Sequence, residues 1–399
     1  MHNISQLTQA LYYVGASDRR LALFENVYPI PRGVSYNSYL LLDEKTALMD
    51  TCDTSVADQF FQNVDAALAG RKLDYMIVNH MEPDHAGTLA TLLMRHPEAT
   101  VVCTAKASQM MAQFFENFAA ATTINVKEGD TLSLGKHQLA FTMAPMVHWP
   151  EVMMTYDTTD KILFSADAFG TFGALSGNLF ADEMDFEHEW LGDARRYYIN
   201  IVGKYGTQVQ NVLKKAATLD IKMICPLHGP IWRERLEWFI SKHDIWSRYE
   251  PEEKAVVIIY GSIYGNTESA AMRLATLLAQ HGVHAIKAYD ASHTHASKLV
   301  SECFRASHIV LASSTYNNGI FTPIENLLAD LKAHAWQKRT VALIENGTWA
   351  AQSGKLMRAE LEQMKDITIV GDTLSLKSAM KTSQEEQLEA LANAIVATL

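Results

Sequence analysis

The chain has 399 residues, too many for one ordinary hydrophobic core and enough for two domains. Hydrophobic residues make up 48% and charged residues 20%, which is the balance of a soluble globular protein. The net charge of −11 excludes nucleic acid as an expected partner, because a phosphate backbone requires a clustered basic surface.

The amino-terminal sequence predicts neither export nor a membrane anchor. It has no basic segment followed by an apolar one, and no apolar run approaches the roughly 18 residues of a membrane helix. The four cysteines, Cys52, Cys103, Cys225 and Cys303, form no CxxC pair, which excludes an iron–sulfur or rubredoxin-type centre in this sequence. We expect reduced thiols in a cytoplasmic protein that binds no membrane.

Residues 1–250 are predicted to form a mixed α/β domain. Short apolar runs predict strands, and longer amphipathic stretches predict helices. We expect strands at 38–42, 46–49, 75–78, 100–103, 138–145 and 161–165, and helices at 56–69 and 106–119.

Seven residues at turns after strand-like runs have the side chains of a two-metal site. They are His80, Glu82, Asp84, His85, His148, Asp167 and His228. Four imidazoles and three carboxylates suit iron or manganese better than zinc, and therefore indicate redox chemistry. A carboxylate with two usable oxygens, Asp167 by its placement, can bridge two cations. The alternative, polar turn residues and satisfied histidines, explains single members but not the dense cluster.

The first four of these residues are predicted to lie on a tight loop, since Pro83 and Gly87 favour a turn. If the segment is extended, positions 80, 82 and 84 point to one side and His85 to the other. One short loop would then serve two metals.

A polar segment with a proline, Tyr249–Lys254, marks the predicted boundary between domains 1–250 and 251–399. Beyond it, five apolar runs alternate with five helix-like segments, which predicts a doubly wound five-stranded parallel sheet of flavodoxin type. We expect strands at 255–260, 285–288, 308–312, 340–344 and 367–370, and helices at 267–281, 296–304, 323–334, 353–364 and 383–398.

Three loops at strand ends of this second domain favour FMN. The first is rich in hydroxyls and glycine but lacks the lysine of a P-loop and the GxGxxG pattern, so it favours a monophosphate over a dinucleotide. A plain strand-to-helix turn is the alternative. Tyr316 and Trp349, in the other two loops, are candidates to stack on the flavin ring. The predicted FMN-binding residues are Ser262, Ile263, Tyr264, Gly265, Asn266, Thr267, Ser314, Thr315, Tyr316, Asn317, Asn318, Gly319, Asn346, Gly347, Thr348 and Trp349.

The frame of His80, Asp84 and His85, with the three downstream ligands, resembles the metallo-β-lactamase fold, an αββα sandwich. The hydrolytic members of that fold have an HxHxDH motif and usually bind zinc. Glu82 stands where they have the second histidine, and this pattern resembles the flavodiiron proteins (A-type flavoproteins). Those proteins carry two non-haem irons in a lactamase-like domain and continue into a flavodoxin domain, so the resemblance covers essentially the whole chain.

The resemblance implies one iron held by His80, Glu82 and His148, and a second held by the other cluster, with a bridge between them. The second iron would take Asp84, His85 and His228, and Asp167 would bridge. The role of His85 stays open, because that position is not a ligand in every family member. Tyr197 or Tyr198 is a candidate hydrogen-bond or proton donor beside the ligands, and a core tyrosine is the alternative.

The resemblance also implies a reductase of O₂ or NO that FMN supplies with electrons. Two ferrous ions and reduced FMN together carry four electrons, as the reduction of O₂ to two waters requires. We expect this reaction, with reduction of NO to N₂O as the alternative. The rivals from other classes are a dizinc hydrolase and an electron carrier with a vestigial lactamase fold.

Two partners follow from the same resemblance. Because the two cofactors lie in different domains, the family forms a head-to-tail homodimer that sets one subunit's FMN beside the other's irons. We expect that dimer, or a dimer of dimers. We also expect a separate rubredoxin-type electron donor with an NADH-dependent reductase, since the sequence has no CxxC centre of its own.

Overall fold

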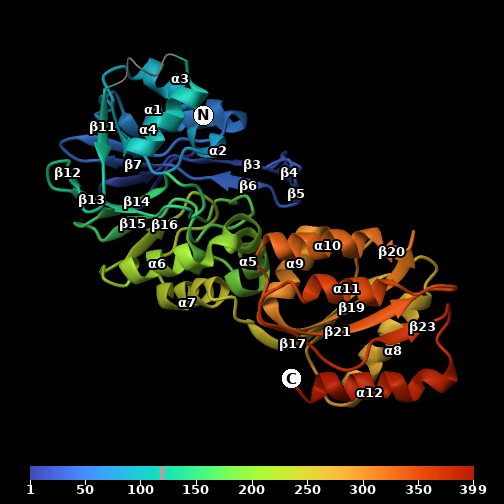
Figure 1. Cartoon of the computed structure of the whole chain (residues 1–399). Helices are drawn as coiled ribbons and strands as arrows, with labels where there is room; N and C mark the ends of the chain where they lie inside the picture. Colours follow the sequence, from blue (N-terminus) through green and yellow to red (C-terminus); the bar gives the residue numbers. More distant parts are fainter. Residues whose placement is uncertain (117–121) are drawn as a thin grey trace. The chain divides into compact units, whose positions relative to one another are not determined.

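The computed structural model describes residues 1–116 and 122–399, and it divides into two compact units (Figure 1). The first unit comprises Met1–Tyr198 and Thr207–Asp244, and the second comprises Ile199–Gly206 and Ile245–Leu399. The second unit takes in two segments before residue 250, and the boundary predicted there stays a prediction. Within the described ranges, no helix is both long and apolar enough to cross a membrane.

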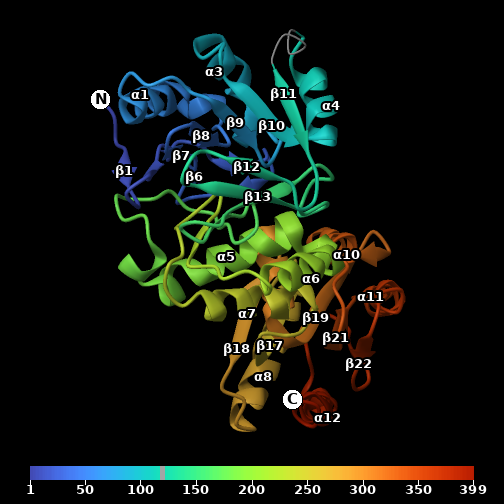
Figure 2. The ribbon, with the colours of Figure 1, turned by 90° about the vertical axis from the view of Figure 1, so that its left-hand side faces the viewer.

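The first unit is a sandwich of two β-sheets between two layers of helices (Figure 2). In spatial order, the larger sheet contains β1 (Ser5–Gln6), β2 (Leu11–Tyr13), β7 (Tyr39–Leu42), β8 (Thr46–Met49), β9 (Tyr75–Val78), β10 (Thr100–Thr104) and β11 (Thr123–Val126). The smaller sheet contains β12 (Thr131–Ser133), β13 (Gln138–Met143), β14 (Met153–Asp157), β15 (Ile162–Phe164) and β16 (Met223–Cys225). Two short pairs complete it: β3 (Ala16–Asp18) with β6 (Val34–Tyr36), and β4 (Leu23–Phe24) with β5 (Tyr28–Pro29).

Helices flank both sheets in this unit. They are α1 (Ala57–Leu68), α2 (Pro83–Ala86), α3 (Leu89–Arg95), α4 (Ala105–Phe114), α5 (Leu191–Tyr197), α6 (Gly206–Ala216) and α7 (Leu236–Ser247). The short helix α2 carries two of the predicted metal ligands. The buried residues Phe60, Val64 and Leu68 recur at helical spacing in α1, so one face of that helix packs inward. The predicted helix 106–119 is shorter than expected, and its positions 117–119 lie outside the described residues.

The second unit contains a parallel sheet with helices on both faces. Its strands, in spatial order, are β18 (Ile286–Asp290), β17 (Glu253–Gly261), β19 (Ala306–Tyr316), β21 (Arg339–Asn346) and β22 (Ile367–Ile369). The helices α8 (Asn266–Gln280) and α12 (Glu385–Val396) lie on one face, and α9 (Ala296–Arg305), α10 (Thr322–Ala333) and α11 (Ser353–Leu361) on the other (Figure 1). The residues Ala255–Ile259 of β17 are all buried, as expected for a parallel strand covered on both sides. Both predicted fold classes are confirmed.

The last strand of this sheet is interrupted, which the sequence did not predict. β22 pairs with the start of β21, and a separate β23 (Leu374–Leu376) pairs with its end. Gly371 separates them with a φ of +67°, and a Cβ there would lie 2.8 Å from Leu391 Cδ1. Because β23 ends beside the end of β21, the loop that follows β23 lies at the carboxyl ends of the strands, as the predicted flavin loops do.

Candidate functional site

The seven predicted metal ligands lie at the ends of four strands of the first unit. His80, Glu82, Asp84 and His85 follow β9, whereas His148 follows β13, Asp167 follows β15 and His228 follows β16. The structure brings all seven together in two adjoining clusters.

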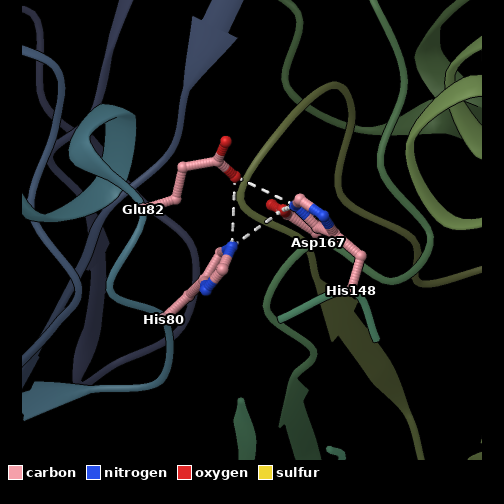
Figure 3. Close-up of side chains that lie close together, drawn as sticks. All are labelled: His80, Glu82, His148 and Asp167. Carbon is pink, nitrogen blue, oxygen red and sulfur yellow. Dashed lines mark hydrogen bonds and ion pairs between the residues drawn. The ribbon is translucent and has the colours of Figure 1, made fainter. Parts of the chain in front are cut away.

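The first cluster contains His80, Glu82, His148 and Asp167 (Figure 3). Glu82 Oε2 lies 3.2 Å from His80 Nε2 and 2.9 Å from His148 Nε2. Asp167 Oδ2 lies 3.3 Å from the same nitrogen of His80 and 3.0 Å from that of His148. Two imidazole nitrogens and two carboxylate oxygens therefore converge on one point.

The second cluster contains Asp84, His85 and His228. Asp84 Oδ2 lies 3.2 Å from Nε2 of each histidine. The other oxygen of Asp167, Oδ1, lies 3.2 Å from His85 Nε2 and 3.7 Å from His228 Nε2. Asp167 thus presents one oxygen to each cluster, which is the geometry of a bridging carboxylate.

The prediction that positions 80, 82 and 84 share one side of an extended segment is wrong. Pro83 begins the short helix α2, and Glu82 is the last extended residue before it. The helical turn rotates Asp84 away from Glu82 and places it with His85 in the second cluster. Proline at the first helical position favours this turn, because its fixed φ suits a helix.

The clusters fit two cations, because carboxylate oxygens and imidazole nitrogens, both of which bind metal ions, converge in each of them. Both oxygens of Asp84 and Oδ1 of Asp167 are buried and make no hydrogen bond of normal geometry in the described chain, although Asp84 Oδ2 and Asp167 Oδ1 each lie 3.2 Å from His85 Nε2. His85 Nε2 and His228 Nε2 face each other at 3.0 Å, where only one of them can carry the shared hydrogen. Such unpaired donors and acceptors are costly unless an ion occupies the space between them.

The protonation of the histidines supports the same conclusion. Burial alone would lower the pKa of these imidazoles, but the carboxylates outweigh it. Asp167 raises the pKa of His80 well above its usual range, and Asp84 raises the pKa of His85 to about 10. Protons thus supply the positive charge that metal ions would supply instead, and metal binding would release those protons.

Three residues behind the ligands were not identified from the sequence. Glu151 Oε1 accepts hydrogen bonds from His80 Nδ1 at 2.8 Å and from the backbone N–H of Met81 at 2.9 Å. His228 Nδ1 donates to the carbonyl of Ser35 at 2.7 Å. Asp50 accepts from the backbone N–H of His80 at 3.1 Å. Each is a single polar residue without a motif, so spacing gives no signal for it.

A further carboxylate, Glu25, lies in the turn between β4 and β5. Part of its side chain is exposed, yet its carboxyl group lies against Glu82. Burial, and then the adjacent Glu82, raise the pKa of Glu25 to about 8. The neighbouring Phe24 packs edge-on against the His228 ring at 5.4 Å, so this hairpin lies beside both clusters.

Of the two candidate tyrosines, Tyr197 lies closer to the ligands. Its ring centroid is 5.4 Å from that of His228, and its hydroxyl is buried without a hydrogen-bond partner among the described residues. Burial, and then Asp167, hold the pKa of Tyr197 well above its usual range, so the hydroxyl stays protonated. Tyr198 instead packs against His243, with a centroid distance of 5.3 Å.

The predicted flavin loops of the second unit surround a cavity of about 680 Å³. All sixteen predicted residues line it except Gly265 and Gly319. Ala350 and Ser378 also line the cavity and were not predicted. Ser378 lies on the loop after β23, where its carbonyl accepts a hydrogen bond from the Asn346 side-chain amide and its N–H donates one to Asn346 Oδ1. No residue that lines the cavity carries a formal charge.

Two local structures shape this cavity. Gly265 caps α8 with a φ of 87° and no side-chain cap, so the first N–H groups of a 15-residue helix face the loop at 262–267. Tyr316 and Gly319 pair across a tight turn in which Asn317 and Asn318 have φ of 48° and 60°. The segment predicted as a loop after the third strand therefore continues β19 as far as Tyr316 and turns back as a hairpin of the type that tolerates positive φ.

The cavity fits FMN. A helix N-terminus with nearby hydroxyls suits a phosphate, and Thr267 Oγ1 lies 2.9 Å from Ser314 Oγ, which joins two of the loops. Trp349 is 89% exposed and Tyr264 92% exposed, which is unusual for large aromatic side chains in a folded domain. A flat aromatic ligand would cover them.

Comparison with known proteins identifies both domains. Residues 34–229 match the family model described as ODP family beta lactamase, and residues 258–390 match the flavodoxin model. An anaerobic nitric oxide reductase flavorubredoxin of Vibrio vulnificus is 32% identical over 85% of this chain and 69% of its own. The flavodiiron protein of Giardia intestinalis has a TM-score of 0.91 and 28% identity, over 100% of this chain and 96% of its own. The rubredoxin oxygen:oxidoreductase of Desulfovibrio gigas gives the same score and identity, over 99% and 98%.

A lactamase-like domain with two adjoining histidine–carboxylate clusters, continued by a flavodoxin domain, defines a two-domain redox flavoprotein. The chain belongs to the flavodiiron protein family. It is therefore an oxidoreductase of the flavodiiron O₂/NO reductase family. The predicted family and enzyme class are confirmed. The flavodoxin domain implies FMN, and the clusters are consistent with a diiron site.

Proposed function

We propose that this protein reduces O₂ to two waters at a diiron centre, with FMN as the immediate electron source. The observation that carries the proposal is Asp167, which presents Oδ2 to the first cluster and Oδ1 to the second. Glu82 adds a carboxylate that favours iron over zinc. Two irons and FMN would supply the four electrons that O₂ reduction requires.

The chain's own residues hold and orient the reactants. His80, Glu82 and His148 would hold one iron, and Asp84, His85 and His228 the other, with Asp167 between them. We propose that the Tyr197 hydroxyl donates a hydrogen bond into the site, since it is buried, protonated and without another acceptor in the described chain. The sixteen predicted residues and Ser378 would hold FMN.

Reduction of NO to N₂O is the second candidate. It is favoured by the relative from Vibrio vulnificus, which is named a nitric oxide reductase, whereas the similar structure from Desulfovibrio gigas is named an oxygen oxidoreductase. Both reactions use the same metal ligands. O₂ is placed first because the two irons and FMN together would carry the four electrons that its reduction requires.

The test is anaerobic reduction of the iron- and FMN-loaded protein, followed by rapid mixing with O₂ or with NO. We expect faster turnover with O₂, four electrons consumed for each O₂, and no peroxide. Turnover of NO roughly tenfold faster, a difference of about 1.4 kcal/mol in the barrier, would reverse the order. Stoichiometric zinc, with hydrolysis of esters or lactams, would instead support the hydrolase alternative.

Exposed apolar side chains support a head-to-tail homodimer, or a dimer of dimers built from it. Leu23 and Val27 flank Glu25 on the hairpin beside the metal clusters, and they are 38% and 50% exposed. A second group surrounds the flavin cavity: Ile263, Tyr264, Tyr316 and Trp349. Apolar groups of this kind mark contact surfaces, and a dimer that sets FMN beside the partner's irons would cover both. A monomer with full activity in sedimentation and turnover assays would contradict it.

We further propose a separate, acidic, rubredoxin-type electron donor, itself reduced by an NADH-dependent reductase. Lys355 on α11 and Lys377 and Lys381 after β23 are exposed and pair with no carboxylate in the described chain. Lys377 directly precedes Ser378, which lines the flavin cavity. The chain as a whole has a net charge of −11, so these exposed lysine side chains near the flavin cavity favour an acidic electron carrier as the partner.

The cytoplasm remains the proposed compartment. The four cysteines are all buried and unpaired, as expected in a reducing environment.

Rapid direct oxidation of NADH by the pure protein would contradict the separate electron donor.

A further inference from the structure

Glu151 stands out among the residues behind the metal clusters, because it meets a ligand imidazole with a full negative charge. Its Oε1 lies 2.8 Å from His80 Nδ1, on the side of the ring opposite to the cluster. The other nitrogen, Nε2, faces Glu82 and Asp167. The Glu151 side chain is only 2% exposed, so water does not weaken this contact.

The other ligand histidines lack such a partner. His228 Nδ1 meets the neutral carbonyl of Ser35, and His85 Nδ1 is buried with no hydrogen-bond partner among the described residues. His80 is therefore the one ligand histidine in the described chain whose Nδ1 contacts a carboxylate. The first cluster therefore contains one histidine with a carboxylate behind it, His80, beside His148, whose carboxylate contacts are made through Nε2, whereas the second cluster contains no such histidine.

The structure also retains Glu151 at a cost. Its second oxygen, Oε2, is buried and has no hydrogen-bond partner in the part of the chain that is described. A buried acceptor without a partner destabilises the fold. A glutamine could accept from the N–H of Met81 with its amide oxygen, so packing alone does not require a carboxylate here.

We infer that Glu151 is a positioning residue that makes the two metal positions inequivalent. It fixes the His80 ring with Nε2 toward the first cluster and makes that nitrogen a stronger donor, because a carboxylate behind an imidazole raises its basicity. The first position therefore holds its metal more tightly than the second. The inference rests on the proposed two-metal centre.

The test compares iron release from the full-length wild-type protein and the variant Glu151→Gln, which keeps size and loses charge. Metal-free protein is loaded anaerobically with Fe²⁺ and then mixed with a chromogenic chelator. We expect two irons for each wild-type chain, released in a slow and a fast phase. In Glu151→Gln the slow phase should accelerate about 10–100-fold, the usual effect of losing such a partner, with the fast phase unchanged.

Asp157→Asn is the matched control, since Asp157 is a buried carboxylate that contacts a histidine, His137, at 2.8 Å but no predicted metal ligand. It should leave both phases as in wild type. Thermal unfolding of the metal-free proteins shows whether each variant folds. If Glu151→Gln does not fold, Glu151→Asp takes its place, because the shorter side chain withdraws the charge from His80 and should also accelerate the slow phase.

The outcomes separate this inference from the proposed function. Binding of fewer than two irons by the wild type would contradict the two-metal centre itself. Two irons released in a single phase, or equal acceleration of both phases in the variant, would overturn the role of Glu151 and leave the centre intact. Unchanged release from Glu151→Gln would overturn it as well.

Discussion

Buried charge is balanced differently in the two units. In the second unit, Glu302 and Arg305 pair at 2.7 Å, Lys298 lies 2.9 Å from the other oxygen of Glu302, and Arg305 also reaches Glu253. Lys287 also lies 3.7 Å from Glu302, so each carboxylate of this network has at least one positive partner. In the first unit, three carboxylates and four imidazoles converge, and several of their atoms make no hydrogen bond of normal geometry in the described chain.

This difference distinguishes the ion-pair network of the second unit, which needs no ligand, from the clusters of the first unit, which fit metal ions. A closed ion-pair network contributes to folding and needs nothing further, whereas an open one is stable only with protons or cations added. The flavin cavity is a third case, since its lining carries no formal charge and comes from several separate loops. We therefore expect large effects from one substitution at the metal clusters and graded effects at the flavin cavity.

The largest effect is expected from Asp167→Ala, because that change removes an oxygen from both clusters at once. Iron content should fall to one atom or fewer for each chain. Activity should fall by more than the roughly 10–100-fold typical of losing a partner behind a ligand. Metal analysis and turnover measure the two effects, and FMN content should not change. Full iron occupancy in this variant would show that Asp167 does not bridge.

The closed network should respond to acid rather than to metal. Burial alone would raise the pKa of Glu302, but Lys298 and Arg305 lower it to about 2. A lowered pKa stabilises the fold above the unfolded-state value, near 4.5, and this stability is lost as pH falls toward 2. At pH 7, Glu302→Gln should cost about 3 kcal/mol, and the difference from wild type should shrink between about pH 5 and pH 2.

Urea unfolding of the full chain at several pH values measures this difference. Glu360→Gln is the control, since Glu360 pairs with Lys332 on the surface, where such pairs contribute at most about 1 kcal/mol. A difference between Glu302→Gln and wild type that did not change with pH would contradict the assignment.

Most of the fold was predictable, because long apolar runs and helical spacing dominate the chain. The interruption between β22 and β23 was not, since β23 has only three residues and follows Gly371, whose φ of +67° no apolar run reveals. For the same reason Ser378 was missed at the flavin cavity. Its place follows from the pairing of β23 with β21, which no local pattern encodes.

The seven metal ligands could be proposed from the sequence because few residue types bind metals and these seven follow strand ends. Their division into clusters was harder. The direction of Asp84 depends on the helical turn that begins at Pro83. Glu151 and Glu25 could not be predicted as residues beside the metal clusters, because a single glutamate in a loop has the same sequence pattern as any surface residue. Only the tertiary structure brings them to the site.

At the flavin cavity, Trp349→Ala should weaken FMN binding by about 3–10-fold, the equivalent of about 0.5–1.5 kcal/mol for an aromatic contact. The residue is 89% exposed in the absence of a ligand, so its loss should not harm folding. Titration of the flavin-free protein with FMN, followed by flavin fluorescence, measures the affinity. Phe114→Ala, at an exposed aromatic residue of the first unit, is the control. A loss of binding greater than 100-fold would contradict the view that many weak contacts share the flavin.

The smallest effect is expected from Lys377→Gln. If an acidic carrier docks beside the flavin cavity, the substitution should slow reduction of FMN by reduced rubredoxin about two- to fivefold at low ionic strength, because one exposed charge contributes about 0.2–1 kcal/mol. The effect should vanish near 0.5 M salt, where screening removes surface attraction. Lys365→Gln is the control, since Lys365 is exposed but precedes β22, which pairs with the start of β21, at the end of the strands opposite to the flavin loops. Reduction by dithionite should be the same in all three proteins, so that slower reduction by rubredoxin alone reports docking, and equal rates with rubredoxin would place the carrier elsewhere.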